Sequence, residues 1–236
     1  MTDIDLEVRE NEFVTIVGRS GCGKSTPLRI LAGLIPASEG VVSIGGEPVT
    51  GPRRDVGFVF QRPALLPWRT VLENVLLPVE VAGGDMVAAR VEAQSLLEVV
   101  GLGGFEKRSP WELSGGMQQR VAMCRALVSN PSVLLMDEPF AALDALTRED
   151  LSLELQRIWS EHRKTIVFVT HSIQEAVVLS DRVIVMTPRP GRVAREIAVD
   201  TARPRDFSSV ERDAGVQAAT DEVRELLFER HAGEAA

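Results

Sequence analysis

A glycine-rich segment between a predicted strand and a predicted helix constrains this chain more than any other feature. The segment reads Gly18-Arg19-Ser20-Gly21-Cys22-Gly23-Lys24-Ser25-Thr26 and follows the apolar run at 13–17. Two glycines separated by four residues and followed by Lys-Ser give the spacing of a phosphate-binding loop. The glycines let backbone N–H groups turn toward one anion, and the positive end of the helix adds to the attraction. The pattern therefore predicts that the chain binds a nucleotide through its phosphates.

Two side chains of this loop have specific predicted roles. Lys24 would reach the β- and γ-phosphates, and the Ser25 hydroxyl would hold Mg²⁺. The alternative is a glycine-rich turn with a surface lysine, but the flanking strand and helix fit the loop. The residues predicted to contact the nucleotide here are Gly18, Ser20, Gly21, Cys22, Gly23, Lys24, Ser25 and Thr26.

An apolar strand followed by two acidic residues forms a second candidate site. Leu134-Leu135-Met136 runs directly into Asp137 and Glu138. An acid at the carboxyl end of a parallel strand faces the ligand crevice of the sheet. Asp137 suits the Mg²⁺ role of a phosphate site, and Glu138 is placed to polarise a water molecule. A charged loop after a buried strand is the alternative, which the phosphate-binding loop makes less favourable.

Gln61 and His171 each stand directly after a predicted strand. Gln61 could contact Mg²⁺ or the attacking water, and His171 could contact the γ-phosphate. Taken alone, either residue is more often just a polar side chain at the start of a loop. The sequence therefore offers both as catalytic candidates, with Gln61 also a metal candidate.

The string Leu113-Ser114-Gly115-Gly116-Met117-Gln118-Gln119-Arg120 opens another predicted helix. A serine and two glycines at a helix start form a second anion-binding end in the same chain. The same pattern is also consistent with a simple helix cap. Two such ends, separated by a largely helical stretch, suggest a nucleotide held between two surfaces. Ser114, Gly115, Gly116 and Gln118 are the nucleotide-contacting candidates in this string.

Strands that alternate with helices predict an α/β fold with a largely parallel sheet. We expect one domain, with a core at about 1–61 and 131–205, a helical insert at about 62–130 and a C-terminal tail at about 206–236. The 26 basic and 34 acidic residues give a net charge of −8, which disfavours nucleic acid as the main partner. The chain has two cysteines, which is too few for a disulfide framework. No uncharged apolar stretch of about 18 residues is present that could span a membrane.

Together these strings resemble the ATPase subunits of ABC transporters, which share the P-loop NTPase fold. Residues 113–120 match the signature motif of that family, Gln61 its Q-loop, and 134–138 its Walker B motif. Residues 141–144, which end in Asp144, match the D-loop, and His171 matches the switch histidine. The resemblance implies ATP and Mg²⁺ as ligands, ATP hydrolysis, and Asp144 as a further nucleotide-site residue.

Longer strings resemble the importer branch for nitrate, sulfonates and taurine. They are Pro63 to Val75, Thr187 to Val193, and Arg203-Pro204-Arg205. The resemblance implies membrane-spanning permease subunits as partners, a solute-binding protein acting through them, and a place on the cytoplasmic face of the cell membrane. It also implies a head-to-tail dimer of this chain that holds two ATP molecules, with Ser114 of one copy completing the site built on Lys24 of the other. Two alternatives remain open: a degenerate copy with little turnover, and an ABC ATPase that does not act in transport.

Two departures from the family pattern are visible. Family members carry an additional N-terminal segment with a strand and an aromatic residue that stacks on adenine, and this sequence contains no tyrosine. Pro27 stands where leucine is usual after Lys-Ser-Thr. If Gly23 caps the helix, Pro27 removes its first i→i−4 hydrogen bond. If the helix begins one residue later, Pro27 lies in the first turn, where no such bond is needed.

Overall fold

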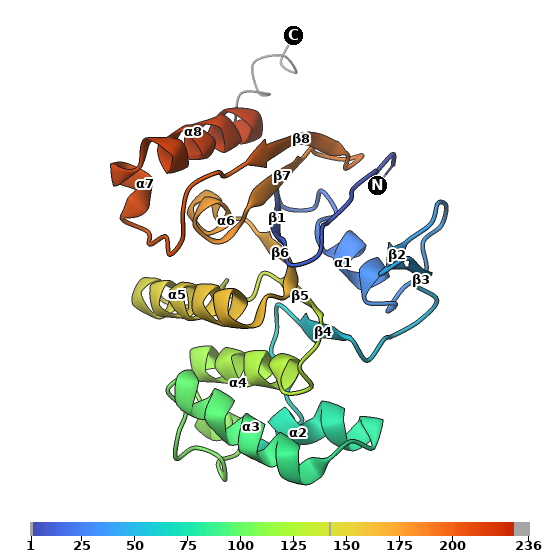
Figure 1. Ribbon diagram of the computed structural model, residues 1–236, viewed down its shortest axis with the longest axis vertical. Helices are drawn as coiled ribbons and strands as arrows, with labels where there is room; N and C mark the ends of the chain where they lie inside the picture. Colours follow the sequence, from blue (N-terminus) through green and yellow to red (C-terminus); the bar gives the residue numbers. More distant parts are fainter. Residues whose placement is uncertain (1, 142, 229–236) are drawn as a thin grey trace. The chain divides into compact units, whose positions relative to one another are not determined.

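The chain divides into two compact units (Figure 1). The first unit holds residues 1–29 and 152–236, and the second unit holds residues 30–151. The computed structural model describes residues 2–141 and 143–228 of the chain. No helix among these described residues is long and apolar enough to cross a membrane. The division into a core, an insert and a tail stays a prediction.

Four strands form the sheet of the first unit. Their order is β6 (Thr165–Thr170), β1 (Phe13–Gly18), β7 (Arg182–Met186) and β8 (Val193–Ala198). β1 runs parallel to both of its neighbours, and β8 runs antiparallel to β7. Every residue of β1 is buried, as expected for a parallel strand that is covered on both faces. This burial fixes the position of Gly18, the last residue of β1 and the first of the phosphate-binding loop.

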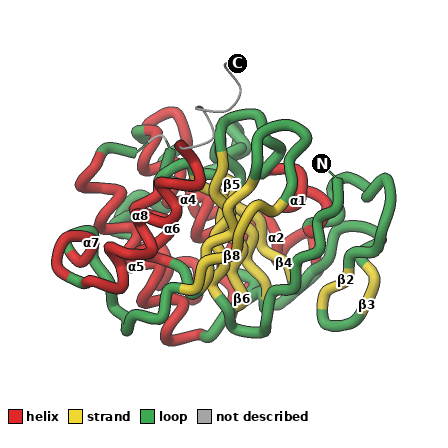
Figure 2. Tube along the Cα trace, turned by 90° about the horizontal axis from the view of Figure 1, so that it is seen from above, coloured by secondary structure: helices red, strands yellow, loops and turns green. Residues whose placement is uncertain are grey.

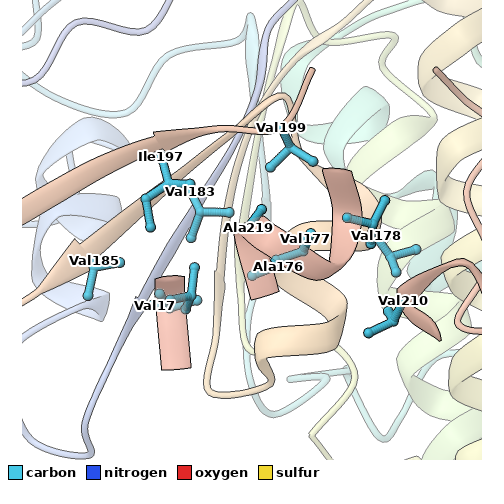
Figure 3. Close-up of a cluster of buried hydrophobic side chains, with 12 residues drawn as sticks. Val17, Ala176, Val177, Val178, Val183, Val185, Ile197, Val199, Val210 and Ala219 are labelled. Atoms are coloured by element: carbon cyan, nitrogen blue, oxygen red, sulfur yellow. The ribbon is translucent and has the colours of Figure 1, made fainter. Parts of the chain in front are cut away.

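Helices cover the sheet of the first unit. They are α6 (Ile173–Leu179), α7 (Ser209–Arg212) and α8 (Ala214–Phe228), and Figure 2 shows α6 and α8 on the same side of the yellow strands. A cluster of buried aliphatic side chains joins them to the sheet (Figure 3). Val17 of β1 and Val183 and Val185 of β7 pack there against Ala176 of α6 and Ala219 of α8. The core of this unit therefore packs against β1, the strand that leads into the phosphate-binding loop.

The second unit combines two parallel strands with a group of helices. β4 (Val56–Val59) pairs with β5 (Val133–Asp137), and β2 (Ser43–Ile44) pairs with β3 (Glu47–Pro48). Three longer helices, α2 (Val71–Ala82), α3 (Met86–Val99) and α4 (Gly115–Leu127), follow in the order predicted, with a 3₁₀ turn, η1 (Pro110–Glu112), before α4. Their shared core contains Val75, Leu97 and Val121, which are fully buried.

Two helices cross the boundary between the units. They are α1 (Ser25–Leu31) and α5 (Ala145–His162). The sequence predicts a helix from about Ala145 to His162, and α5 has these bounds. Thr70 with Glu73 three residues later predicts a capping box, and α2 begins with one, in which Thr70 and Glu73 each bond the other's backbone N–H. Capping residues next to an apolar periodic run define helix ends well. For this reason the helices of the second unit were predicted closely.

Two predictions about the ends of the chain were wrong. The alternation of Ile4, Leu6 and Val8 with acidic residues predicts a strand, but the structure has no strand at 4–8. A strand requires a ladder of backbone bonds to a partner. The Glu7 carbonyl instead accepts a hydrogen bond from a side chain, Arg182 Nη2. The sequence also predicts a helix from about Asp221 to Arg230, but this helix begins earlier, at Ala214. It begins there because Asp213 accepts the Gly215 and Val216 N–H groups as an N-cap. Its last two predicted residues lie outside the described residues.

Candidate functional site

The phosphate-binding loop connects β1 to α1. Gly21 and Gly23 have φ values of 79° and 103°, a left-handed region that glycine enters without steric cost. Lys24 is 6% exposed, and its Nζ donates to the Gly18 carbonyl at 2.8 Å and to the Arg19 carbonyl at 3.3 Å. The ammonium group is therefore held inside the curve of its own loop, where a phosphate would lie.

The surface beside this loop is concave and cationic. A cavity of about 450 Å³ is lined by Arg19, Ser20, Gly21 and Cys22 together with Pro188 and Arg189. The guanidinium group of Arg19 suits an anion, and Arg189 is bonded to the loop backbone through its Nε. Thr26, the remaining loop candidate, donates its N–H to the Gly23 carbonyl at 2.9 Å in the first turn of α1. The loop as a whole fits the phosphates of a nucleotide.

The end of β5 carries the acidic pair. Asp137 is the last residue of the strand and is 3% exposed. Glu138 follows it with a φ of 45°, a conformation that costs about 1–3 kcal/mol for a residue other than glycine. Such strain persists where the surrounding structure holds the residue, and it is frequent at functional sites. The geometry thus aims Glu138 away from the line of the strand.

Gln61 and Glu138 are brought together although 77 positions separate them. Gln61 Nε2 donates to Glu138 Oε2 at 2.9 Å. Gln61 belongs to the segment that follows β4, the strand that pairs with β5. This arrangement places an amide and a carboxylate at the same end of two parallel strands, where either could contact a water molecule.

His171 directly follows β6 in the first unit. Ser172, the next residue, caps α6 by accepting the Glu175 N–H. The preceding Thr170 donates its hydroxyl to Glu175 Oε2 at 2.5 Å and accepts the Ser172 N–H. His171 is exposed between two residues whose backbones are fixed by these bonds. Gln61 and Glu138 belong to the other unit.

The second predicted anion site is the start of α4. Ser114 Oγ accepts the Met117 N–H at 3.3 Å, which makes Ser114 the N-cap. Gly115 and Gly116 form the first turn, whose N–H groups have no partner within a helix. The Gln118 amide turns away, donating to the Pro110 and Leu113 carbonyls. Ser114 and the two glycines thus form the N-terminal end of α4. Gln118 holds the segment that precedes this helix.

Asp144 has a structural function in this fold. Its carboxylate accepts the Thr147 N–H at 3.0 Å at the start of α5. This backbone hydrogen bond lowers the pKa of Asp144 below its usual range, because it stabilises the charged form. Ala142, which belongs to the same predicted D-loop, lies outside the described residues. Asp144 is thus a helix cap as well as the nucleotide-site candidate that the resemblance implies.

Mg²⁺ is the metal that the predicted site requires. Its candidate ligands are the Ser25 hydroxyl, the Asp137 carboxylate and the Gln61 amide oxygen, all of them hard oxygen donors of the kind Mg²⁺ prefers. Within the part of the chain that the structure describes, no group of three or more His, Cys, Asp or Glu side chains could hold a metal ion. Ser25 belongs to the first unit, and Gln61 and Asp137 belong to the second.

Comparison with known proteins identifies the family of this chain. The profile of the ABC transporter family matches residues 1–141. An ABC transporter ATP-binding protein of Methanocaldococcus jannaschii, whose function is uncharacterised, is 53% identical over 89% of this chain and 79% of its own length. The chain belongs to the ABC transporter family.

Relatives and solved structures of this family extend the match. The taurine import ATP-binding proteins TauB of Rhizobium johnstonii and Burkholderia thailandensis are 43% and 46% identical over 95% and 86% of this chain, and over 87% and 78% of their own lengths. The dimeric structure of the bacterial ABC transporter cassette MJ0796 has a TM-score of 0.77 at 38% identity, covering 84% of this chain and 90% of that one. The ABC cassette fold is therefore established for this chain, including its mostly parallel sheet with an antiparallel edge.

Two residues of this ABC protein that the sequence analysis missed hold the segment around Gln61. Gln119, 1% exposed, donates from Nε2 to the Phe60 carbonyl at 3.1 Å. Arg125 donates to the Ala64 and Pro63 carbonyls at 2.8 and 2.7 Å. Both residues project from α4, so the helix that begins at Ser114 also anchors the backbone on both sides of Gln61. Two long polar side chains on the buried face of a helix were the sequence signal for this role.

Pro27 causes little disruption in this ABC cassette. Helix α1 begins at Ser25, so Pro27 is its third residue. The N–H groups of the first turn have no helical partner, and a proline there removes no hydrogen bond. The second of the two alternatives from the sequence is therefore the one observed.

Proposed function

We propose that this ABC protein hydrolyses ATP and thereby drives import of a small sulfonate-like or other anionic solute through a permease. The observation that carries the hydrolysis proposal is the contact of Gln61 with Glu138 beside the buried Asp137. A carboxylate held in a strained conformation and bonded to an amide suits a group that positions water. Lys24 and its loop supply the phosphate-binding half of the reaction.

Binding begins at the phosphate loop in this proposal. Lys24 exchanges its bonds to the Gly18 and Arg19 carbonyls for bonds to phosphate oxygens. The loop N–H groups and the N-terminus of α1 add electrostatic attraction. Because the lysine already points into the loop, little reorganisation is needed when the nucleotide arrives.

Hydrolysis then requires water in line with the γ-phosphorus. Glu138 accepts a hydrogen bond from this water and takes its proton, Gln61 helps to orient it, and His171 contacts the γ-phosphate. Attack by water breaks the bond between the γ-phosphorus and the β–γ bridging oxygen, and the products are ADP and inorganic phosphate. Ser25 and Asp137 would hold Mg²⁺, which would neutralise charge on the phosphate oxygens.

In this proposal the N-terminal end of α4 contributes to the nucleotide site of a second copy of the chain. Ser114 and the glycines after it would face the nucleotide bound to the partner's phosphate loop, and Asp144 would lie near that junction. Two solved structures of MJ0796 support this arrangement. Both are dimeric, and one is a post-hydrolysis state with bound ADP and phosphate. Two copies of this chain would then close around ATP and open after hydrolysis.

The import half of the proposal comes from relatives. The TauB proteins, which are similar over most of this chain, are described as taurine import proteins. The partners of this chain would be permease subunits, with a solute-binding protein acting through them, and its place would be the cytoplasmic face of the membrane. The alternatives are a copy with little turnover and an ABC ATPase without a permease.

Two measurements test these proposals separately. The purified chain should release phosphate from Mg-ATP, and Lys24→Ala should abolish the release. Absence of turnover in the wild-type chain and in its permease complex would favour the copy with little turnover. The import half is tested with a permease encoded by a neighbouring gene. The chain should co-purify with it, and vesicles that contain both should take up taurine or another sulfonate in an ATP-dependent way. Robust hydrolysis without any permease association would favour the ATPase that does not act in transport.

A further inference from the structure

The turn that joins β7 to β8 lies against the phosphate-binding loop, and the proposed reaction does not use it. Gly18 and Met186 are register partners in the sheet, so the loop and the turn leave adjacent parallel strands at the same end. Thr187 fixes the turn: its N–H donates to the Arg192 carbonyl, its hydroxyl donates to the Pro190 carbonyl, and the same hydroxyl accepts the Arg192 N–H. The turn is therefore a defined structure beside the loop.

Two residues of this turn touch the loop backbone. A Cβ atom on Gly191 would lie 2.2 Å from the Cys22 carbonyl oxygen, so the close approach requires glycine. Arg189 Nε donates to the Gly21 carbonyl at 2.7 Å. Arg189 and Pro188 also line the cavity of about 450 Å³ beside the loop. The contact thus falls within the four residues that separate the two glycines of the phosphate-loop pattern.

The orientation of these peptide groups decides whether the loop can bind phosphate. The site needs backbone N–H groups facing the anion, so the carbonyl groups must face away from it. Gly21 has a φ of 79°, and glycine allows its peptide planes to rotate more freely than other residues do. A donor that holds the Gly21 carbonyl from outside restricts that rotation.

We propose that Arg189 is a positioning residue for the nucleotide, which holds the Gly21 carbonyl so that the loop N–H groups stay turned toward the phosphates. The proposal rests on the proposed ATP site in the same loop. It gives a function to part of the Thr187–Val193 string, for which the sequence indicated only a resemblance to one importer branch. Arg189 acts here through the loop backbone and not through contact with the reacting atoms.

Side-chain length makes a matched set of variants available. In Arg189→Gln the amide Nε2 occupies the same place along the side chain as arginine Nε, so the donor is kept and the charge is lost. In Arg189→Met the length is kept and the donor is lost. Arg189→Lys keeps the charge. Arg192→Met is the control, because Arg192 belongs to the same turn but bonds Thr2 and Asp3 instead of the loop.

Binding of Mg-ADP and Mg-ATP is measured by calorimetric titration, and steady-state hydrolysis separates KM from kcat. We expect Arg189→Met to weaken binding and raise KM about 3- to 10-fold, the range for losing one hydrogen bond of ordinary strength. Arg189→Gln should stay within about 2-fold of wild type, since a bond of this kind is retained. The kcat and the melting temperature without nucleotide should be unchanged in both, and Arg192→Met should match wild type.

Several results would overturn the proposal. Unchanged nucleotide binding in Arg189→Met would show that the bond from Arg189 to the Gly21 carbonyl does not contribute to nucleotide affinity. Rescue by Arg189→Lys but not by Arg189→Gln would show that the charge acts directly on the nucleotide. A loss shared by Arg192→Met, or a lower melting temperature without nucleotide, would show a general structural effect. If Arg189→Met does not fold, Arg189→Ala takes its place. Failure of the proposed function is distinct, since wild type would then bind no better than Lys24→Ala.

Discussion

The N-terminal ends of α1 and α4 are both candidate anion sites, yet they are built in different ways. α1 has seven residues, with Leu28 its buried side chain, and it follows a loop whose own lysine folds back onto it. α4 has thirteen residues, is buried from Val121 to Leu127, and begins with the serine cap Ser114. The phosphate loop therefore has its cation built in. The residues that begin α4 are a serine and two glycines, which offer a hydroxyl and backbone N–H groups.

This difference suggests a division of labour. A site with a buried cation can bind a polyphosphate by itself, because charge-assisted hydrogen bonds are about twice as strong as neutral ones. A capped helix end without a cation contributes a smaller attraction, of about 0.3–1 kcal/mol at an exposed position. We therefore expect the α1 end to capture ATP in a single chain. The α4 end would act when another copy brings the nucleotide to it.

The largest expected effect is on the chemical step and leaves nucleotide binding at the two helix ends unchanged. Glu138→Gln leaves the two ends intact but removes the group that takes the proton from water. We predict that kcat falls by about 10²- to 10⁴-fold, while the affinity for ATP stays nearly unchanged. Rapid-quench assays and nucleotide titration of the same preparation measure the two quantities. A variant that keeps more than half of the wild-type turnover would remove Glu138 from the reaction.

A smaller effect tests how firmly α4 is packed. Burial raises the pKa of the Cys124 thiol to about 12, whereas an unfolded thiol ionises near 8.5–9. Between these values the folded chain binds the extra proton, so stability falls as pH rises. We predict that from pH 9 to 10 wild type loses about 1 kcal/mol more unfolding free energy than Cys124→Ala does. Urea denaturation of both forms measures it, and equal losses would show that Cys124 reaches solvent in α4.

The smallest effect concerns the start of α1. Because Pro27 lies in the first turn, Pro27→Leu breaks no helical hydrogen bond and gains none. Leucine adds packing area, but it releases the unfolded chain from the restraint of proline, which is worth about 0.4–1 kcal/mol. We predict a change within about 0.5 kcal/mol in unfolding free energy. Melting curves that rise by several degrees would show that proline strains α1 after all.

The sequence predicted what short-range chemistry determines. The phosphate loop, the strand before Asp137 and the cap at Ser114 are all patterns within a few residues, and the structure has them in those places. Contacts between distant residues were not predictable in the same way. Arg189 meets Gly21 across 168 positions, and Gln119 meets Phe60 across 59. At Ile4–Val8 the sequence predicted a strand that the structure does not have. Local alternation cannot supply the partner strand that a sheet requires.

The division of labour between the two helix ends can be tested most directly at Ser114. In a Glu138→Gln background, which prevents turnover, Ser114→Asp keeps an N-cap acceptor but sets a negative charge where the partner's nucleotide would lie. Ser114→Asn is the matched neutral control. ATP-dependent assembly is measured by light scattering, and ATP affinity by titration at concentrations where the chain is monomeric. The account predicts that the Asn form assembles into dimers with ATP, whereas the Asp form binds ATP equally well and remains monomeric. Equal assembly of the two forms, or loss of ATP binding by the monomeric Asp form, would contradict it.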